Sequence, residues 1–354
     1  MRMAPISWIV RFLIFCFWIL VIGLFLLIPT VANHFKQEKS LTIFTWPLLI
    51  DPIYLKKFEQ ETGIKLYISY FDNSAALLNK MIATNGRGYD LVIPDDRSLE
   101  LLIAHGLIKK IDHSKLDFWA KLNPVLLGNY ADRANEYSIP YYWGVYGIGY
   151  DQNLIKGEIT PSWEILFNPT LCVNTRLCMT DEPREAIMIA AQYLFGSIEA
   201  LKDKAAQEQV KQLLIAQKKY VEVYTISRSD SLLQSKSCGF AAIMSPDLWR
   251  LSREFPHIKM VIPAPSSFAI IDSFALCAAT RKQDLIYTFL NYLYRPEVLT
   301  HHMQNFGFCS PLEHTFLPGQ EEFCPMDRFA SFEFFRNIIS DDEINQIWIE
   351  VLAA

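Results

Sequence analysis

Acidic side chains stand at several points of the sequence where they suit the binding of a cation. Asp95 and Asp96 follow the apolar run that ends at Pro94, and Asp272 interrupts the otherwise apolar segment 269–279. An unpartnered carboxylate is expensive to bury, so Asp272 indicates a functional group rather than core packing. Asp95 and Asp96 also suit an ordinary turn. The chemistry that such residues perform most directly is the pairing of positively charged groups.

A second acidic pair, Glu182 and Glu185, stands at the start of a helix that Pro183 is expected to begin. The helix dipole alone favours acidic residues at such a start, which gives the pair a structural explanation. Two carboxylates of this kind could instead be the acid and base of an exported hydrolase. However, the sequence contains neither G-x-S-x-G nor H-E-x-x-H, and we expect no catalytic residues.

The elements that would position these side chains alternate between strands and helices. Leu41–Trp46, the segment IKLYISYF and Tyr89–Pro94 are expected strands, separated by two helices. Asp51 can cap the first helix and Gly63 can end it, while Ser74 is the expected cap of the second. Such alternation predicts a parallel sheet, whose ligands lie outside the carboxyl ends of the strands. That rule points to Trp46, Asp95, Asp96 and Arg97.

The alternation continues toward the C-terminus. Further strands are expected at Tyr137–Asp151, Leu171–Thr180, Cys238–Ser245, Ile258–Pro263 and Ala269–Ala279. Further helices are expected at Ser98–Ala104, Ile198–Tyr220 and Ile344–Leu352, and from Pro161, Pro183, Asp284 and Pro296. The sequence therefore predicts an α/β protein.

The N-terminus differs from the rest of the chain. Phe12–Val31 is an uncharged apolar run, long enough to span a bilayer, and Arg2 and Arg11 precede it. Positive charge before such a run predicts export of the remainder. Cleavage after Ala32 and retention of the run as an inner-membrane tether both stay open. We expect residues 1–39 to be a signal peptide or membrane anchor with its linker, and the rest to be periplasmic.

Composition narrows the function further. The 354 residues suit about two domains, and the net charge of −5 without a basic stripe argues against nucleic acid as a partner. The sequence has no C-x-x-C motif, and His301 and His302 are adjacent, so we expect no metal site. An exported chain can use disulfides, for which two pairings are open, Cys172 with Cys178 and Cys309 with Cys324. Cys238 and Cys277 are expected to be small buried hydrophobes.

Several segments together resemble one protein family. FTW, YDLVIP, YSIPYYWGVYGIGYD, TDEPREAIMIAA, GFAAIMS and IDSFALCAATRKQD follow one another across residues 41–352. In content and order they resemble the bacterial spermidine/putrescine-binding proteins, the periplasmic receptors of ABC-type polyamine importers. The resemblance implies a two-lobed α/β fold, the type II periplasmic-binding-protein fold, with a cleft between the lobes. Lobe I would comprise 40–138 and 272–311, and lobe II would comprise 139–271 and 312–354.

The resemblance also implies a set of ligand-binding residues: Trp46, Asp95, Glu182, Glu185, Asp272 and Phe308. Asp95 and Arg97 stand where the family has a hydroxyl residue and a tyrosine, and Met244 and Ile270 replace tryptophans. The acidic contacts are kept while part of the aromatic box is lost, which favours a cation without favouring spermidine in particular. Arg97 would repel an amine or pair with Asp95 or Asp96.

We therefore expect a monomeric extracytoplasmic solute-binding protein without a cofactor. It would bind a polyamine such as spermidine or putrescine, or a similar organic cation, close around it, and present the closed form to ABC permease subunits in the inner membrane. Two alternatives remain: the exported hydrolase with Glu182 and Glu185, and a membrane-tethered cation sensor that keeps its N-terminal segment.

Overall fold

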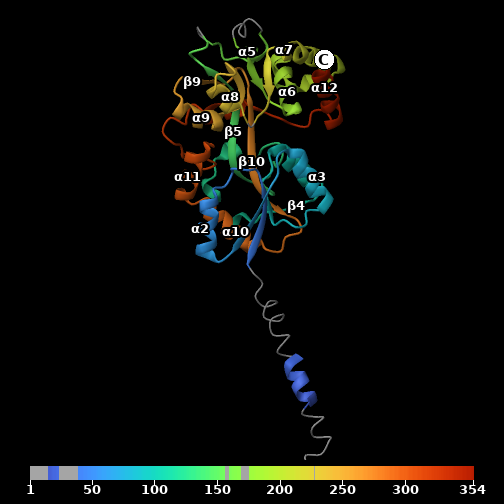
Figure 1. Ribbon diagram of the computed structural model, residues 1–354, viewed down its shortest axis with the longest axis vertical. Coiled ribbons are helices and arrows are strands. Elements are labelled where there is room, and N and C mark those ends of the chain that lie inside the picture. The colour runs from blue at the N-terminus through green and yellow to red at the C-terminus, as the bar shows by residue number, and fades with distance from the viewer. Residues whose placement is uncertain (1–14, 24–38, 156–158, 169–174, 227) are drawn as a thin grey trace, which may run out of the picture.

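The chain folds into two halves joined by a pair of long strands (Figure 1). The computed structural model describes residues 15–23, 39–155, 159–168, 175–226 and 228–354. The described strands form one sheet in the order β2-β1-β3-β10-β5-β8-β6-β7, with β4 and β11 also paired to β10 and β9 to β5. The long strands β5 (Ile139–Asp151) and β10 (Phe268–Cys277) lie at its centre.

The first half is built as the alternating pattern predicts. Its strands are β1 (Ser40–Thr45), β2 (Lys65–Tyr70), β3 (Leu91–Val92) and β4 (Ile108–Lys109). Its helices are α2 (Pro52–Thr62), α3 (Ser74–Thr84), α4 (Asp96–Ala104), α10 (Gln283–Leu293) and α11 (Pro296–Phe306). β1 pairs in parallel with both β2 and β3, so the ends of β1 and β3 open onto the same edge of the sheet.

Helix capping in this half agrees with the sequence at α2 and differs at α3. Asp51 caps α2, and Gly63 ends it with a left-handed φ of 71°. The cap of α3 is Asn73 instead of Ser74, because the Asn73 side chain accepts the bond from the first turn. Ser74 instead donates a hydrogen bond to Asp95 Oδ2 at 2.7 Å. The serine thereby ties α3 to an expected site residue.

The second half carries the remaining elements. Its strands are β6 (Leu177–Met179), β7 (Val221–Tyr224), β8 (Phe240–Met244), β9 (Ile258–Val261) and β11 (Glu333–Phe334). Its helices are α5 (Glu164–Phe167), α6 (Pro183–Phe195), α7 (Lys204–Lys218), α8 (Ser229–Gln234), α9 (Ser245–Glu254) and α12 (Asp341–Ala353). β8, β6 and β7 pair in parallel, which repeats the arrangement of the first half.

Two expected elements of this half are shorter in the structure. The helix expected over Ile198–Tyr220 is broken, because Asp203 accepts a hydrogen bond from the backbone of Ala205 and starts α7 anew. The strand expected from Leu171 is described only as β6, and residues 169–174 lie outside the described residues.

β5 and β10 connect the halves as an antiparallel ribbon. β10 pairs with β3 at its Ala275 end and with β5 from Ala269 onward, so a single strand belongs to both halves. β5 in turn pairs with β8 and β9 beyond Tyr146. The register of the ribbon shifts between Asp272 and Ser273, which is the mark of a β-bulge. Bulges often aim a side chain toward a functional site.

One of the two expected disulfides is present. In the other expected pair, only Cys178 is described, and it is not in a disulfide. Cys309 and Cys324 are bonded, and they bracket the loop that follows α11. Cys178 is a buried free cysteine, and Cys172 lies outside the described residues. Cys238 and Cys277 are buried and free, as expected.

Loss of the Cys309–Cys324 bond should destabilise the protein. The bond closes a loop with a sequence separation of 15. The loop-entropy relation for that length gives about 3 kcal/mol of stability. We expect the Cys309→Ser/Cys324→Ser variant to show that loss in urea unfolding, and reductant to have the same effect on the wild type. Equal midpoints with and without reductant would contradict this.

The N-terminal expectations fall mostly on residues 1–14 and 24–38, which lie outside the described residues. Residues 15–23 are helical. None of the helices in the described ranges has the length and apolar character needed to cross a membrane.

Candidate functional site

The start of α4 supplies the first two carboxylates of the site. Asp95 caps α4 through a bond from the backbone N–H of Ser98 at 2.7 Å. Asp96 is 3% exposed, and its Oδ2 has no hydrogen-bond partner among the described residues. Burial, together with the negative charge of Asp95, raises the pKa of Asp96 to about 7. Asp95 therefore has an ordinary structural role as the cap of α4. Asp96 has no capping role.

Asp272 extends this acidic group from the central ribbon. It lies at the bulge of β10, opposite Tyr142 of β5, and is 7% exposed. Burial and then the charges of Asp95 and Asp96 raise the pKa of Asp272 well above its usual range. The indole N–H of Trp46 opposes part of that rise without making a hydrogen bond of ordinary geometry. Asp272 and the start of α4 thus share one site, and Trp46 borders it.

The start of α6 brings a carboxylate of the second half toward the same place. Glu182 occupies the N-cap position of α6, but its side chain makes no capping hydrogen bond. Burial, then the charges of Asp181 and Asp95, raise the pKa of Glu182, and the charge of Arg97 opposes that rise. Because Asp95 and Arg97 belong to the first half, Glu182 faces across the junction. A helix-dipole role alone would not explain that position.

Glu185 lies one turn further along α6. Its Oε2 accepts hydrogen bonds from the hydroxyls of Tyr146 and Thr180, the latter at 2.7 Å. Burial raises the pKa of Glu185 to about 8 against the effect of the Tyr146 bond, and the charges of Glu182 and Asp95 add to the rise. The expected carboxylates of the two halves therefore lie within reach of one another's charge.

Asp247 is a further carboxylate near the site that the sequence motifs did not single out. It lies in the first turn of α9 with its side chain 36% exposed, and it accepts a hydrogen bond from Arg250 at 3.2 Å. The surrounding protein raises the pKa of Asp247 to about 6, while the charge of Arg250 opposes the rise. The Tyr142 pKa is raised by burial and then by the charges of Asp247 and Asp272, so the Tyr142 ring lies close to both. Asp247 comes just after the end of β8, as Asp95 comes just after β3, and the strand-end rule would have found it.

Buried polar atoms without a hydrogen-bond partner gather around these carboxylates. Within the described part of the chain they include Thr45 Oγ1, Trp46 Nε1, Ser98 Oγ and Ser273 Oγ. Asp96 Oδ2 and Tyr130 OH lie beside each other without a hydrogen bond of ordinary geometry. Buried polar groups in folded proteins are nearly always hydrogen-bonded. Their concentration at the ends of β1 and β3 and at the β10 bulge indicates a place prepared for a polar ligand.

Phe308 has a different position from the one expected. It is 0% exposed and lies in the core of the first half, with its ring 5.5 Å from that of Tyr142. The Phe308 ring packs in the core against Tyr141, Tyr142 and His302, so its contact with a ligand stays a prediction. The residue that presents an aromatic ring to Asp272 is Tyr142, which alternates with the buried Tyr141 along β5.

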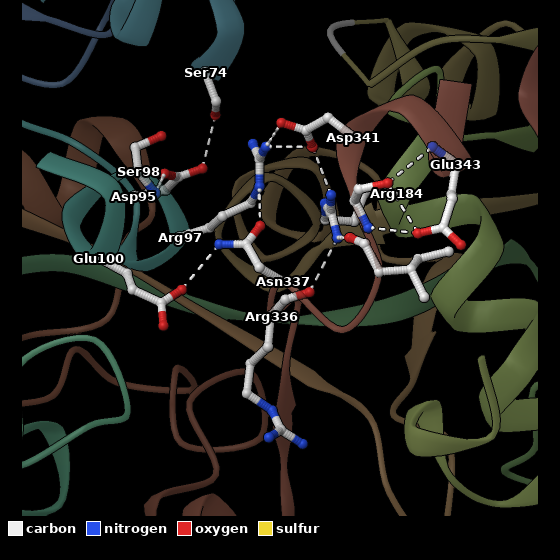
Figure 2. Close-up of polar contacts among 12 residues, drawn as sticks. Ser74, Asp95, Arg97, Ser98, Glu100, Arg184, Arg336, Asn337, Asp341 and Glu343 are labelled. Carbon is white, nitrogen blue, oxygen red and sulfur yellow. Dashed lines mark hydrogen bonds and ion pairs between the residues drawn. The ribbon is translucent and has the colours of Figure 1, made fainter. Parts of the chain in front are cut away.

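Arg97 does not pair with Asp95 or Asp96 as one alternative expected. Its Nη2 binds both oxygens of Asp341 at 2.7 and 2.8 Å, and its Nε donates to Asn337 Oδ1 at 2.9 Å (Figure 2). Arg184 of α6 binds the same Asp341. Asp341 and Asn337 belong to the second half, so Arg97 of α4 makes a direct polar contact between the halves.

The two adjacent histidines, His301 and His302, take part in structural contacts. His301 hydrogen-bonds Asp51, and His302 hydrogen-bonds Tyr141. Over the described ranges there is no group of His, Cys, Asp and Glu side chains able to hold a metal ion.

Comparison with known proteins assigns the family. A family model for bacterial extracellular solute-binding proteins matches residues 54–319. The chain belongs to this family. The function of this solute-binding protein is therefore extracytoplasmic solute binding.

Curated relatives and solved structures agree with the family. The solute-binding protein is 30% identical over 292 residues to the putrescine-binding periplasmic protein PotF of Escherichia coli strain K12, covering 78% of this chain and 79% of PotF. It is 29% identical over 279 residues to the putrescine-binding periplasmic protein SpuD of Pseudomonas aeruginosa strain UCBPP-PA14, covering 74% and 76% of the two chains. The spermidine/putrescine ABC transporter substrate-binding protein PotD of Streptococcus pneumoniae superimposes with a TM-score of 0.76, at 21% identity over 89% of this chain and 99% of PotD. The two-lobed fold expected from the sequence is confirmed.

Proposed function

We propose that this solute-binding protein binds a polyamine, or a similar organic cation, between its two halves and delivers it to an ABC permease. The observation that carries the proposal is a group of carboxylates at the junction of the halves, of which Asp96 of α4 and Asp272 of β10 are buried and Glu185 of α6 and Asp247 of α9 are half-buried. Each has a raised pKa because burial and like charges oppose its ionisation. The positive charge of an ammonium group in the site would favour the ionised carboxylates and so lower their pKa values.

The neighbouring side chains suit the rest of such a ligand. A polyamine is a chain of ammonium groups joined by methylenes, so it needs carboxylates for its charges and flat apolar walls for its carbons. Trp46 and Tyr142 offer aromatic faces next to Asp272. The relatives named above as putrescine-binding proteins support the same ligand class.

Binding would close the halves and create the surface that the permease recognises. We propose lobe I as 40–138 with 272–311 and lobe II as 139–271 with 312–354. The bending element would be the β5–β10 ribbon, with no chemical change to the ligand. The protein would act as a monomer in the periplasm, with its N-terminal segment either removed or kept as a tether.

Calorimetric titration tests the ligand class. We expect saturable binding of putrescine or spermidine and none of thiamine or ferric citrate. Recovery of the amine unchanged after prolonged incubation would exclude the hydrolase alternative with Glu182 and Glu185. If none of the amines binds, the proposed function is wrong. Mass measurement of the mature protein, with or without residues 12–31, would separate a free receptor from a tethered sensor.

Amine affinity should rise with pH. Asp247, Asp96 and Glu185 have pKa values raised to about 6, about 7 and about 8, whereas these carboxyls ionise near 4 in an unfolded chain. Raised native pKa values favour the unfolded state as pH increases, so the ligand-free protein should lose stability between about pH 4 and about pH 8. An amine binds the ionised carboxylates, so it should bind more tightly and release protons over the same interval.

Calorimetry in two buffers of different ionisation enthalpy measures the released protons, and thermal unfolding of the ligand-free protein measures the stability. A binding enthalpy that is the same in both buffers near pH 6–7, about where these groups titrate, would contradict the expected proton release.

A further inference from the structure

The starts of α4 and α6 repeat one short pattern on the two sides of the junction. Asp95 and Arg97 stand two positions apart at the start of α4, and Glu182 and Arg184 have the same spacing at the start of α6. Both arginines bind Asp341, while both carboxylates face the acidic site. The pattern therefore brings the Arg97 guanidinium, which is bound to Asp341, within reach of the charge of Glu182 across the junction.

Charge is not balanced within this group. One carboxylate, Asp341, receives two guanidiniums, so the trio keeps a net positive charge (Figure 2). The pKa of Asp341 is lowered because its bond from Arg184 and the charge of Arg97 outweigh the effect of burial. The Arg97 side chain is 15% exposed, and its Nε is held by Asn337, which in turn donates to Glu100 of α4. Arg97 is thus fixed in place in the ligand-free structure.

We propose that Arg97 is a specificity-determining residue, whose fixed positive charge beside Asp95 and Glu182 occupies the place of one ligand ammonium. The remaining carboxylates, Asp272 and Asp96 above all, are left for the ligand. The site then prefers a short cation with few charges, such as a diamine, over a triamine. This inference rests on the proposed function and names the size class of its ligand.

The energetic reason is like-charge repulsion at short range. A third ammonium brought to the Asp95–Glu182 end meets a guanidinium that is anchored by Asp341 and cannot swing away without breaking its bonds. In a partly buried setting such a repulsion changes affinity by about tenfold. An uncharged side chain at position 97 would remove it and leave the negative charges of Asp95 and Glu182 to attract a longer amine.

The test is the ratio of spermidine to putrescine affinity, measured by calorimetry on the full chain. We expect the wild type to prefer putrescine, and Arg97→Met to raise the spermidine-to-putrescine affinity ratio by about tenfold. Arg97→Lys keeps the charge and should keep the wild-type ratio. Arg295→Met removes a surface arginine paired with Glu61, and it controls for loss of a guanidinium elsewhere.

Asp341→Asn separates charge from contact between the halves. It removes the charge that anchors Arg97 but keeps the Arg97 charge, so the guanidinium can move away from a third ammonium. The preference for putrescine should therefore fall, by less than in Arg97→Met. A ratio that does not change in Arg97→Met, with putrescine still bound, overturns the inference and leaves the proposed function standing. A wild type that binds neither amine overturns both.

Discussion

Asp272→Asn should weaken amine binding by about 2–5 kcal/mol, because a buried ammonium loses the carboxylate that pairs with it. Asp272 is 7% exposed and lies beside Asp95 and Asp96, whose charges contribute to its raised pKa. Asparagine has the shape of the protonated acid, so the ligand-free variant should fold normally and have an unfolding temperature equal to or above that of the wild type. Calorimetry and thermal unfolding of the same samples measure both quantities.

A matched control uses an exposed carboxylate of the second half. Asp342→Asn changes an exposed side chain in the first turn of α12, and we expect its amine affinity to equal that of the wild type. Wild-type affinity in Asp272→Asn would remove Asp272 from the site. A ligand-free variant that is strongly destabilised would show instead that the carboxylate has a structural role.

Gly307→Ala should destabilise the protein by about 2–5 kcal/mol. Gly307 ends α11 with a φ of 78°, which costs a residue with a side chain about 1–2 kcal/mol. A Cβ there would also lie 2.2 Å from the carbonyl oxygen of Pro246 in α9, and relieving that overlap adds about 1–3 kcal/mol. Urea unfolding measures the sum. Because α9 also carries Asp247, displacement of the helix should lower amine affinity as well.

Gly196→Ala separates the two contributions. Gly196 ends α6 in the same conformation, with a φ of 68°, and an added Cβ would meet nothing within 4 Å. The free energy of unfolding of that variant should fall by only about 1–2 kcal/mol, the cost of the backbone conformation, and its amine affinity should stay unchanged. Equal losses in the two variants would show that α11 and α9 do not need their close approach at Gly307.

The sequence predicted those local features of the fold that depend only on neighbouring residues. Asp51 and Gly63 bound α2 as expected, because a cap needs only the first or last turn of its own helix. The cap of α3 is Asn73 instead of the expected Ser74. Either of these adjacent residues could cap the helix, but Ser74 hydrogen-bonds the distant Asp95. The sequence carries no sign of that pairing.

Only part of the site was predicted, because some of its features depend on residues that are distant in the sequence. The strand-end rule and the family resemblance found Trp46, Asp95 and Asp272, and the structure brings them together, although their contact with a ligand stays a prediction. Phe308 is fully buried against Tyr142, and only the packed core decides which of two neighbouring rings is covered.

The partner of Arg97 could not be predicted from the sequence. It is Asp341, 244 positions away, and the two meet only because α4 and α12 lie on opposite sides of the junction. Local pairing with Asp95 or Asp96 was the natural expectation from neighbouring residues. Long-range ion pairs of this kind depend on the complete fold.

The central ribbon also has an evolutionary consequence. β10 completes the sheet of each half, and β5 begins in one half and ends in the other. A gene fragment encoding one half would lack a strand that its own core requires, so neither half can be inherited, duplicated or shuffled as a separate module. A change in β5 or β10 therefore acts on both halves at once, so the two halves are constrained to evolve together.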